Sequence, residues 1–184
     1  MARLLGKVLD MARLEAGVVR LQAEWYALDE IVGSVLARLG ALLHGREVAL
    51  RLAADLPMVR VDAVLLGQVL ENLIENAVKY TRFGSPVEIG AQLQADELQL
   101  WVADRGRGIP AGFESRIFEK FYRGGDSGLR GGAGLGLTIC RVLIEAHGGR
   151  IAAENRPGGG AIFMMRIPAT QAPPPAIVEE AGAE

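Results

Sequence analysis

A run of glycines at residues 131–136, Gly-Gly-Ala-Gly-Leu-Gly, could hold the phosphate groups of a ligand. Glycine lets backbone N–H groups come close to an anion, and a helical pattern begins at the end of the run, so the helix N-terminus would add attraction. The spacing fits neither a P-loop, which needs GxxxxGK[ST], nor the strand-first GxGxxG of dinucleotide folds. A flexible loop without a ligand would have the same composition, so the run alone does not decide.

Asp104 closes an alternating apolar segment and is followed by Gly106 and Gly108. A carboxylate at that place can accept a hydrogen bond from an exocyclic amine, while the glycines allow a flat ring to approach. An aspartate that only caps a turn would have the same neighbours. The residues themselves leave both interpretations open.

Residues 62–81 carry further polar groups at helical spacing. Asn72, Asn76, Lys79 and Tyr80 would share one arc of a helix. The neighbouring arc is apolar and consists of Leu66, Leu70, Leu73, Ile74 and Ala77. A solvated helix face would show the same pattern. Residues 118–123 mix aromatic side chains with two cations that could reach phosphates or belong to an ordinary amphipathic turn.

Helical and strand patterns alternate along the chain and predict the scaffold for these groups. Helices are expected at 2–16, 29–44, 62–81, 113–121 and 135–146, with Asp29 and Asp62 as N-caps. Within 29–44 the side chains expected to point inward are Ile31, Val32, Val35, Leu36, Leu39 and Leu42. An extended segment is expected at 18–26, and strands at 48–52, 58–61, 87–93, 98–102, 151–154 and 161–167. This order favours a two-layer α/β sandwich, with helices on one face of a mixed, mainly antiparallel sheet.

Composition narrows the class of protein. The 184 residues are 50% hydrophobic and 23% charged, which is typical of one globular domain with a short appendage. Lys plus Arg number 20 and Asp plus Glu number 22, so charge gives no reason to expect nucleic acid or an acidic membrane as partner. The single cysteine, Cys140, excludes an internal disulfide and is expected to pack in the core. No apolar run reaches the ~18–20 residues of a membrane span, and we expect no signal peptide.

Four segments together resemble the ATP-binding domain of sensor histidine kinases, members of the GHKL or Bergerat superfamily. NLIENAVKYT at 72–81 is similar to the N box of that family and DRGRGIP at 104–110 to its G1 box. IFEKFYR at 117–123 is similar to the F box and GAGLGLTIC at 132–140 to the G2 box. The resemblance covers about residues 18–168, and the runs 60–81 and 139–151 look closest to the KdpD branch of potassium- and turgor-responsive sensor kinases.

The resemblance implies the Bergerat fold, ATP and Mg²⁺ as ligands, and transfer of the γ-phosphoryl group to a histidine. By position in the N box, Asn76 would coordinate Mg²⁺, Asn72 would help to position the metal and phosphates, and Lys79 would meet phosphate charge. Gyrase-like, chaperone-like and mismatch-repair-like relatives have a water-activating glutamate in place of Asn72. Because an asparagine cannot act as a general base, the sequence predicts ATP held for transfer rather than for hydrolysis.

The other boxes would supply the binding residues. Tyr80 would pack near the adenine, Asp104 would bind its amine beside Gly106 and Gly108, and Ile109 would line the ring pocket. The lid hinge and phosphate cradle would consist of Lys120, Arg123, Gly132, Gly134, Leu135, Gly136 and Leu137. Residues 124–134 are expected to form a mobile loop.

The phospho-acceptor motif of the family is missing from this sequence. Residues 1–17 resemble only the end of the second helix of a dimerisation hairpin, residues 18–168 would be the catalytic domain, and residues 169–184 would be a disordered tail. His44 and His147 are expected to be helix C-terminal residues rather than acceptors. The implied partners are the histidine-bearing hairpin of the same kinase and a response regulator, with this domain cytoplasmic in a membrane-anchored homodimer. A degenerate docking module and a water-using ATPase of the same fold remain as alternatives.

Overall fold

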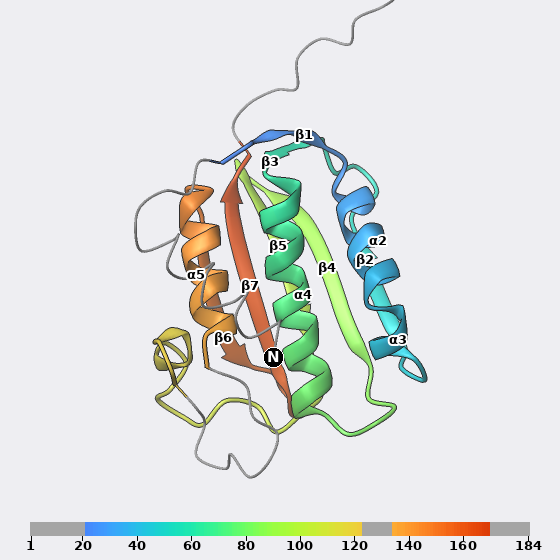
Figure 1. Cartoon of the computed structure of the whole chain (residues 1–184), viewed down its shortest axis with the longest axis vertical. Helices are drawn as coiled ribbons and strands as arrows, with labels where there is room; N and C mark the ends of the chain where they lie inside the picture. Colours follow the sequence, from blue (N-terminus) through green and yellow to red (C-terminus); the bar gives the residue numbers. More distant parts are fainter. Residues whose placement is uncertain (1–20, 123–133, 170–184) are drawn as a thin grey trace, which may run out of the picture.

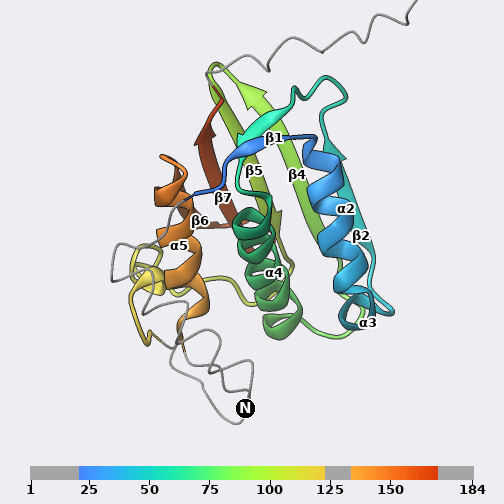
Figure 2. The same cartoon turned by 45° about the horizontal axis from the view of Figure 1, so that its top comes forward.

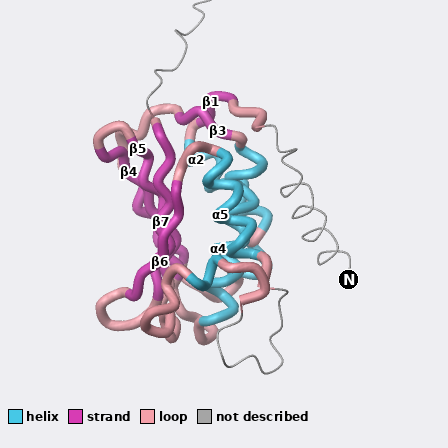
Figure 3. Tube along the Cα trace, turned by 90° about the vertical axis from the view of Figure 1, so that its left-hand side faces the viewer, coloured by secondary structure: helices cyan, strands magenta, loops and turns pink. Residues whose placement is uncertain are grey.

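Alternating apolar residues build a mixed sheet with the order β2-β4-β5-β7-β6. The computed structural model describes residues 21–122 and 134–169. The strands are β2 (Val48–Leu52), β4 (Val87–Gln94), β5 (Glu97–Ala103), β6 (Arg150–Asn155) and β7 (Ala161–Pro168). Only the β2–β4 pairing is parallel, and the other three pairings are antiparallel. This is the two-layer α/β arrangement predicted from the sequence, because the helices lie together on one face of the sheet (Figure 3).

The helix layer is centred on α4 (Ala63–Tyr80), which lies between α2 (Leu28–Arg38) and α5 (Gly136–Ala146) across the sheet (Figure 1). Asp62 caps α4 as predicted, since its Oδ1 accepts hydrogen bonds from the N–H groups of Val64 and Leu65 at 3.1 Å each. The apolar arc of α4 is buried against the sheet, and Leu66, Leu70, Leu73 and Ile74 are all 0% exposed. Burying each such side chain stabilises the fold by roughly 1.5–3 kcal/mol, so this helix is the main organiser of the core.

A short ribbon of β1 (Glu24–Tyr26) and β3 (Val59–Val61) crosses one end of the two layers (Figure 2). The backbone N–H of Gln22, just before this ribbon, donates to Asp62 Oδ2 at 3.0 Å. The Asp62 N–H donates to His147 Nε2 at 3.1 Å, so Nε2 carries no proton. The imidazole proton therefore lies on Nδ1, which donates to the Leu143 carbonyl at 2.7 Å. His147 thus follows α5 as its C-cap, as expected, and His44 holds the same place after α3 (Gly40–Leu43).

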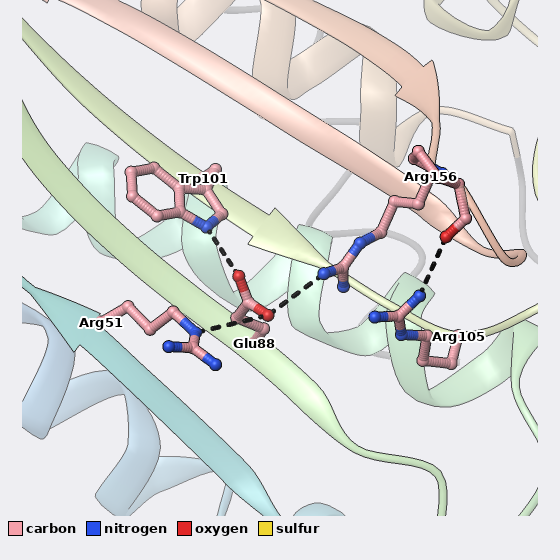
Figure 4. A network of polar contacts seen from close by, with 6 residues as sticks. Arg51, Glu88, Trp101, Arg105 and Arg156 are labelled. Carbon is pink, nitrogen blue, oxygen red and sulfur yellow. Dashed lines mark hydrogen bonds and ion pairs between the residues drawn. The ribbon is translucent and has the colours of Figure 1, made fainter.

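The sheet face opposite the helices carries a polar network around Glu88 (Figure 4). The Trp101 indole N–H donates to Glu88 Oε1 at 3.3 Å, and Arg156 Nη2 donates to Oε2 at 3.2 Å. Arg51 lies 3.6 Å from the same carboxylate. Burial acts to raise the pKa of Glu88, but the bonds from Trp101 and Arg156 outweigh it and hold that pKa below its ordinary value. The network ties β2, β4, β5 and the β6–β7 turn together.

The helix predicted at 29–44 was wrong in three details. Residues 29–44 form two helices, α2 and α3, because the backbone of Leu39 leaves helical values (φ −91°, ψ 6°) just before Gly40. The break changes the helical register, so Leu43 is buried while Leu42, expected inward, is 41% exposed. Asp29 is not the cap, since Ala27 holds that position without a side-chain bond and Asp29 lies in the first turn.

The helix predicted at 113–121 was also wrong in extent. Only Arg116–Phe118 form a 3-10 helix, η1, and Phe121 adopts a positive φ of 61°, which ends any helical path. The expected helix at 2–16, the loop at 124–133 and the tail beyond residue 169 lie outside the described residues. Cys140 is fully buried, as predicted. None of the described helices has the length and apolar character that crossing a bilayer requires.

Candidate functional site

Asp104 follows the last residue of β5 and is almost completely buried, with 5% of its surface exposed. Its Oδ1 accepts hydrogen bonds from the Gly106 N–H at 2.7 Å and the Ala161 N–H at 3.3 Å. The aspartate therefore does cap a turn, but within the described chain its other oxygen, Oδ2, has no hydrogen-bond partner. Burial raises the pKa of Asp104, although the two backbone bonds and the charge of Arg156 act against that shift.

The loop after Asp104 lies against the C-terminal end of α4. A Cβ atom on Gly106 would be only 2.6 Å from the backbone oxygen of Tyr80, so only glycine allows this approach. Ile109, in the same loop, is 9% exposed and its side chain joins the core. The structure thus brings the 72–81 and 104–110 segments together, as their predicted roles require.

The polar arc of α4 is graded in exposure. Asn72 is buried, at 4% exposed, whereas Asn76 and Lys79 are half-buried and Tyr80 is 45% exposed. The Lys79 ammonium lies 4.9 Å from the centre of the Tyr80 ring, and the Arg107 guanidinium lies 5.4 Å from it. Two cations beside one aromatic ring give this end of α4 a positive character. No sequence pattern singled out Arg107 for this position.

The N-terminus of α5 lies beside Asn72. A Cβ atom built on Gly136 would be 3.4 Å from Asn72 Oδ1, so the first turn of α5 faces the arc of α4. Leu135, the N-cap residue, is 3% exposed and makes no side-chain cap bond, which leaves first-turn N–H groups without a cap. The Thr138 hydroxyl in the same turn is buried without a hydrogen-bond partner among the described residues. Such a turn suits an anion.

The segment after η1 contacts the chain just before α5. The Phe121 N–H donates to the Gly134 carbonyl at 3.2 Å, and a Cβ on Gly134 (φ +69°) would lie 2.9 Å from the Phe121 Cα. Lys120 is exposed next to this contact, and Leu137 is half-buried on α5. Arg123 and Gly132, predicted to contact phosphates, lie outside the described residues.

These residues fit a magnesium-bound nucleoside triphosphate. Within 21–122 and 134–169 no group of three or more His, Cys, Asp or Glu side chains could hold a metal ion. The carboxamide oxygen of Asn76 is a hard ligand of the kind that Mg²⁺ prefers, so this residue would hold the ion. The uncapped first turn of α5 and Lys79 supply the positive charge that the phosphates require.

Asn155 contacts the loop after Asp104, although the sequence analysis did not single it out. Its side chain forms two hydrogen bonds with the backbone of Ile109, although the two residues are separated by 46 positions in the chain. The sequence analysis expected only the two strands on either side of this segment, and the Pro157-Gly-Gly-Gly160 run between them is typical of a hairpin turn rather than of a site.

Comparison with known families and proteins gives one consistent result. A model of the family described as histidine kinase-, DNA gyrase B-, and HSP90-like ATPase matches residues 61–171. Sensor protein KdpD of Escherichia coli is 44% identical over 171 residues, which is 93% of this chain and 19% of that protein. Sensor protein DivL of Caulobacter vibrioides is 37% identical over 175 residues, or 94% of this chain and 22% of that protein. The chain thus spans about a fifth of the length of these relatives.

Solved structures agree in fold. The full-length structure of ShkA in complex with AMPPNP superposes with a TM-score of 0.80 at 31% identity, over 90% of this chain and 35% of that one. The nucleotide-free catalytic domain of the histidine kinase ThkA superposes with a TM-score of 0.72 at 27% identity, over 80% of this chain and 96% of that domain. ThkA in complex with the response regulator TrrA superposes with a TM-score of 0.76 at 26% identity, over 92% of this chain and 48% of that one.

Proposed function

Because the chain belongs to the family of histidine kinase-, DNA gyrase B-, and HSP90-like ATPases, as a catalytic domain of the sensor histidine kinase type, we propose that it binds Mg-ATP and transfers the γ-phosphoryl group to a histidine. The acceptor would lie on a dimerisation hairpin outside this sequence. The Bergerat fold of the family, a sheet covered on one face by helices, matches the architecture of the chain.

The observation that carries the proposal is the buried carboxylate of Asp104. Backbone N–H groups hold Oδ1, so the side chain is fixed, and Oδ2 is left to accept a hydrogen bond from a ligand. The exocyclic amine of adenine is such a donor, whereas guanine has a carbonyl oxygen at the same place. Ile109 would supply the apolar wall for the ring. The loop therefore favours adenine over guanine nucleotides.

The asparagine at position 72 favours phosphoryl transfer over ATP hydrolysis. It is buried beside Gly136, at the place where the related water-using ATPases have a glutamate. A carboxamide can position phosphates or a metal by hydrogen bonding, but it cannot take a proton from water. A water-using ATPase is for this reason the weaker candidate.

The residues of this chain would act by positioning and by charge. Phosphoryl transfer needs in-line geometry and neutralisation of phosphate charge more than covalent help from the protein. Lys79, the α5 N-terminus and the exposed Lys120 would hold the phosphates, while Asp104 holds the base at the other end. Bound Mg²⁺, held by Asn76, would neutralise charge on the phosphate oxygens.

The partners and boundaries follow from the same proposal. Residues 1–17 would end the second helix of the dimerisation hairpin, and residues 18–168 would form the catalytic domain. The complex of ThkA with the response regulator TrrA supports a receiver domain as the final acceptor of the phosphoryl group. In a membrane-anchored sensor kinase this domain would lie on the cytoplasmic side.

Titration calorimetry tests the ligand. Purified protein should bind ATP with Mg²⁺ present, and removing Mg²⁺ with a chelator should weaken the binding. GTP should bind at least several-fold more weakly than ATP. If neither ATP nor ADP binds at millimolar concentration, the proposed function is wrong.

A further inference from the structure

We infer that Asn155 is a positioning residue that sets the adenine specificity of the Asp104 loop, an inference that rests on the proposed function. Asn155 is the last residue of β6, and its side chain is exposed. Its Oδ1 accepts a hydrogen bond from the Ile109 N–H at 2.7 Å, and its Nδ2 donates to the Ile109 carbonyl at 2.8 Å. The Asn155 carboxamide thus satisfies both the N–H and the carbonyl of Ile109, as the backbone of a neighbouring strand would do in a sheet.

The contact depends on Gly108. This residue has a φ of +74°, and a Cβ atom there would overlap the carboxamide oxygen of Asn155. The left-handed backbone turns the loop so that both polar groups of Ile109 face β6. Gly108 and Asn155 therefore act as one unit, although they come from different parts of the chain.

The β6–β7 hairpin holds the loop at both ends. At one end, the Asp104 N–H donates to the Ala161 carbonyl at 2.9 Å, and the Ala161 N–H donates back to Oδ1 at 3.3 Å. At the other end, Asn155 holds Ile109. These two attachments fix the distance between the Asp104 carboxylate, which would accept a hydrogen bond from the adenine amine, and the Ile109 side chain, which would line the ring. Asn155 itself need not touch the nucleotide.

The hairpin is in turn attached to the sheet from the opposite face. Arg156, next to Asn155 in the chain, donates a hydrogen bond to Glu88 at 3.2 Å (Figure 4). The backbone N–H of Arg156 also donates to the Gly160 carbonyl at 2.9 Å, which closes the turn. Asn155 is therefore carried on a rigid support, as a positioning residue requires.

The experiment compares Asn155→Ala, Asn155→Asp and, as a control, Glu154→Ala, an exposed neighbour on β6. Calorimetry on the full chain measures the Kd of ATP, GTP and inorganic tripolyphosphate. Asn155→Ala should weaken ATP binding about tenfold, since both hydrogen bonds that hold the part-buried backbone of Ile109 are lost. Asn155→Asp should weaken ATP at least as much, because a carboxylate cannot donate to the Ile109 carbonyl. All variants should bind tripolyphosphate with the same Kd, and Glu154→Ala should bind all three ligands as the parent protein does.

A double-variant cycle adds a readout that general damage would not give. Gly108→Ala should weaken ATP binding, because its new Cβ would overlap the Asn155 carboxamide oxygen. The double variant Gly108→Ala with Asn155→Ala should lose less binding free energy than the two single variants together, because that oxygen is then absent. Equal ATP-to-GTP ratios in the parent and Asn155→Ala proteins would overturn the inference, as would a parallel loss of tripolyphosphate binding. If the parent protein itself fails to bind ATP, it is the proposed function that is wrong.

Discussion

Replacing Asp104 with asparagine should change which base the protein prefers. In the parent protein Oδ1 accepts from the Gly106 and Ala161 N–H groups. The carboxamide oxygen of the Asp104→Asn side chain must keep that position, because an NH₂ group there would face two donors. Its NH₂ group then takes the place of Oδ2, where it faces the adenine amine donor to donor. The same group could donate to the carbonyl oxygen of guanine.

The size of the change follows from the burial of the site. Asp104 is 5% exposed, so an unmatched polar group there costs about 1–3 kcal/mol, which is roughly 5- to 150-fold in Kd. We therefore expect the parent to favour ATP over GTP by that factor, and Asp104→Asn to lose or invert the preference. Competition binding with both nucleotides measures the ratio directly.

A matched control comes from the surface. Asp55→Asn makes the same chemical change at an exposed position and should leave the ATP-to-GTP ratio as it is in the parent. An unchanged ratio in Asp104→Asn, in a protein with the parent melting temperature, would refute base recognition by this side chain.

Three further predictions concern charge and the metal. Asn76→Ala should weaken Mg-ATP by roughly tenfold or more while leaving metal-free adenosine binding and the Tm unchanged; a sharp fall in Tm would instead make Asn76 structural. Burial raises the pKa of Asp104 above its ordinary 3.8, so this carboxylate should be protonated, and ATP affinity should fall, at a higher pH than an exposed aspartate would give. Dividing the parent's ATP affinity by that of Asp104→Asn at each pH isolates the effect of this one protonation. The pKa of Glu88 is lowered from 4.5, so its ionised form contributes stability that is complete above that value and disappears as the pH falls through the lowered one. Urea unfolding of Glu88→Gln should differ from the parent at neutral pH and converge with it in acid; a constant difference would contradict the network.

Local patterns predicted most of the scaffold. Asp62 as the cap of α4, the apolar arc through Leu73 and the hairpin of β6 and β7 all depend on residues close in sequence. The break at Leu39 was not predicted, because Gly40 is a weak signal within an otherwise continuous helical pattern. The exchange of Leu42 for Leu43 in the core follows from that single break.

The site was predicted by type but not by geometry. The turn-capping and ligand-binding interpretations of Asp104 were treated as alternatives, whereas the structure gives its two oxygens different environments. The contacts of Asn155 with Ile109 and of Arg107 with Tyr80 depend on how distant or adjacent segments are packed. No periodicity or spacing in one sequence reports such contacts, since they depend on the tertiary path of the chain.

Phosphoryl transfer from labelled ATP tests the central proposal most directly. The full chain would be mixed with a separately purified dimerisation hairpin that carries the acceptor histidine, together with Mg²⁺ and ATP that carries a radioactive γ-phosphate. The proposal predicts label on the hairpin, none when that histidine is replaced by alanine, and little free phosphate when the hairpin is omitted. Rapid phosphate release without the hairpin, and no label on it when present, would show an ATPase that uses water and would contradict the role inferred from Asn72.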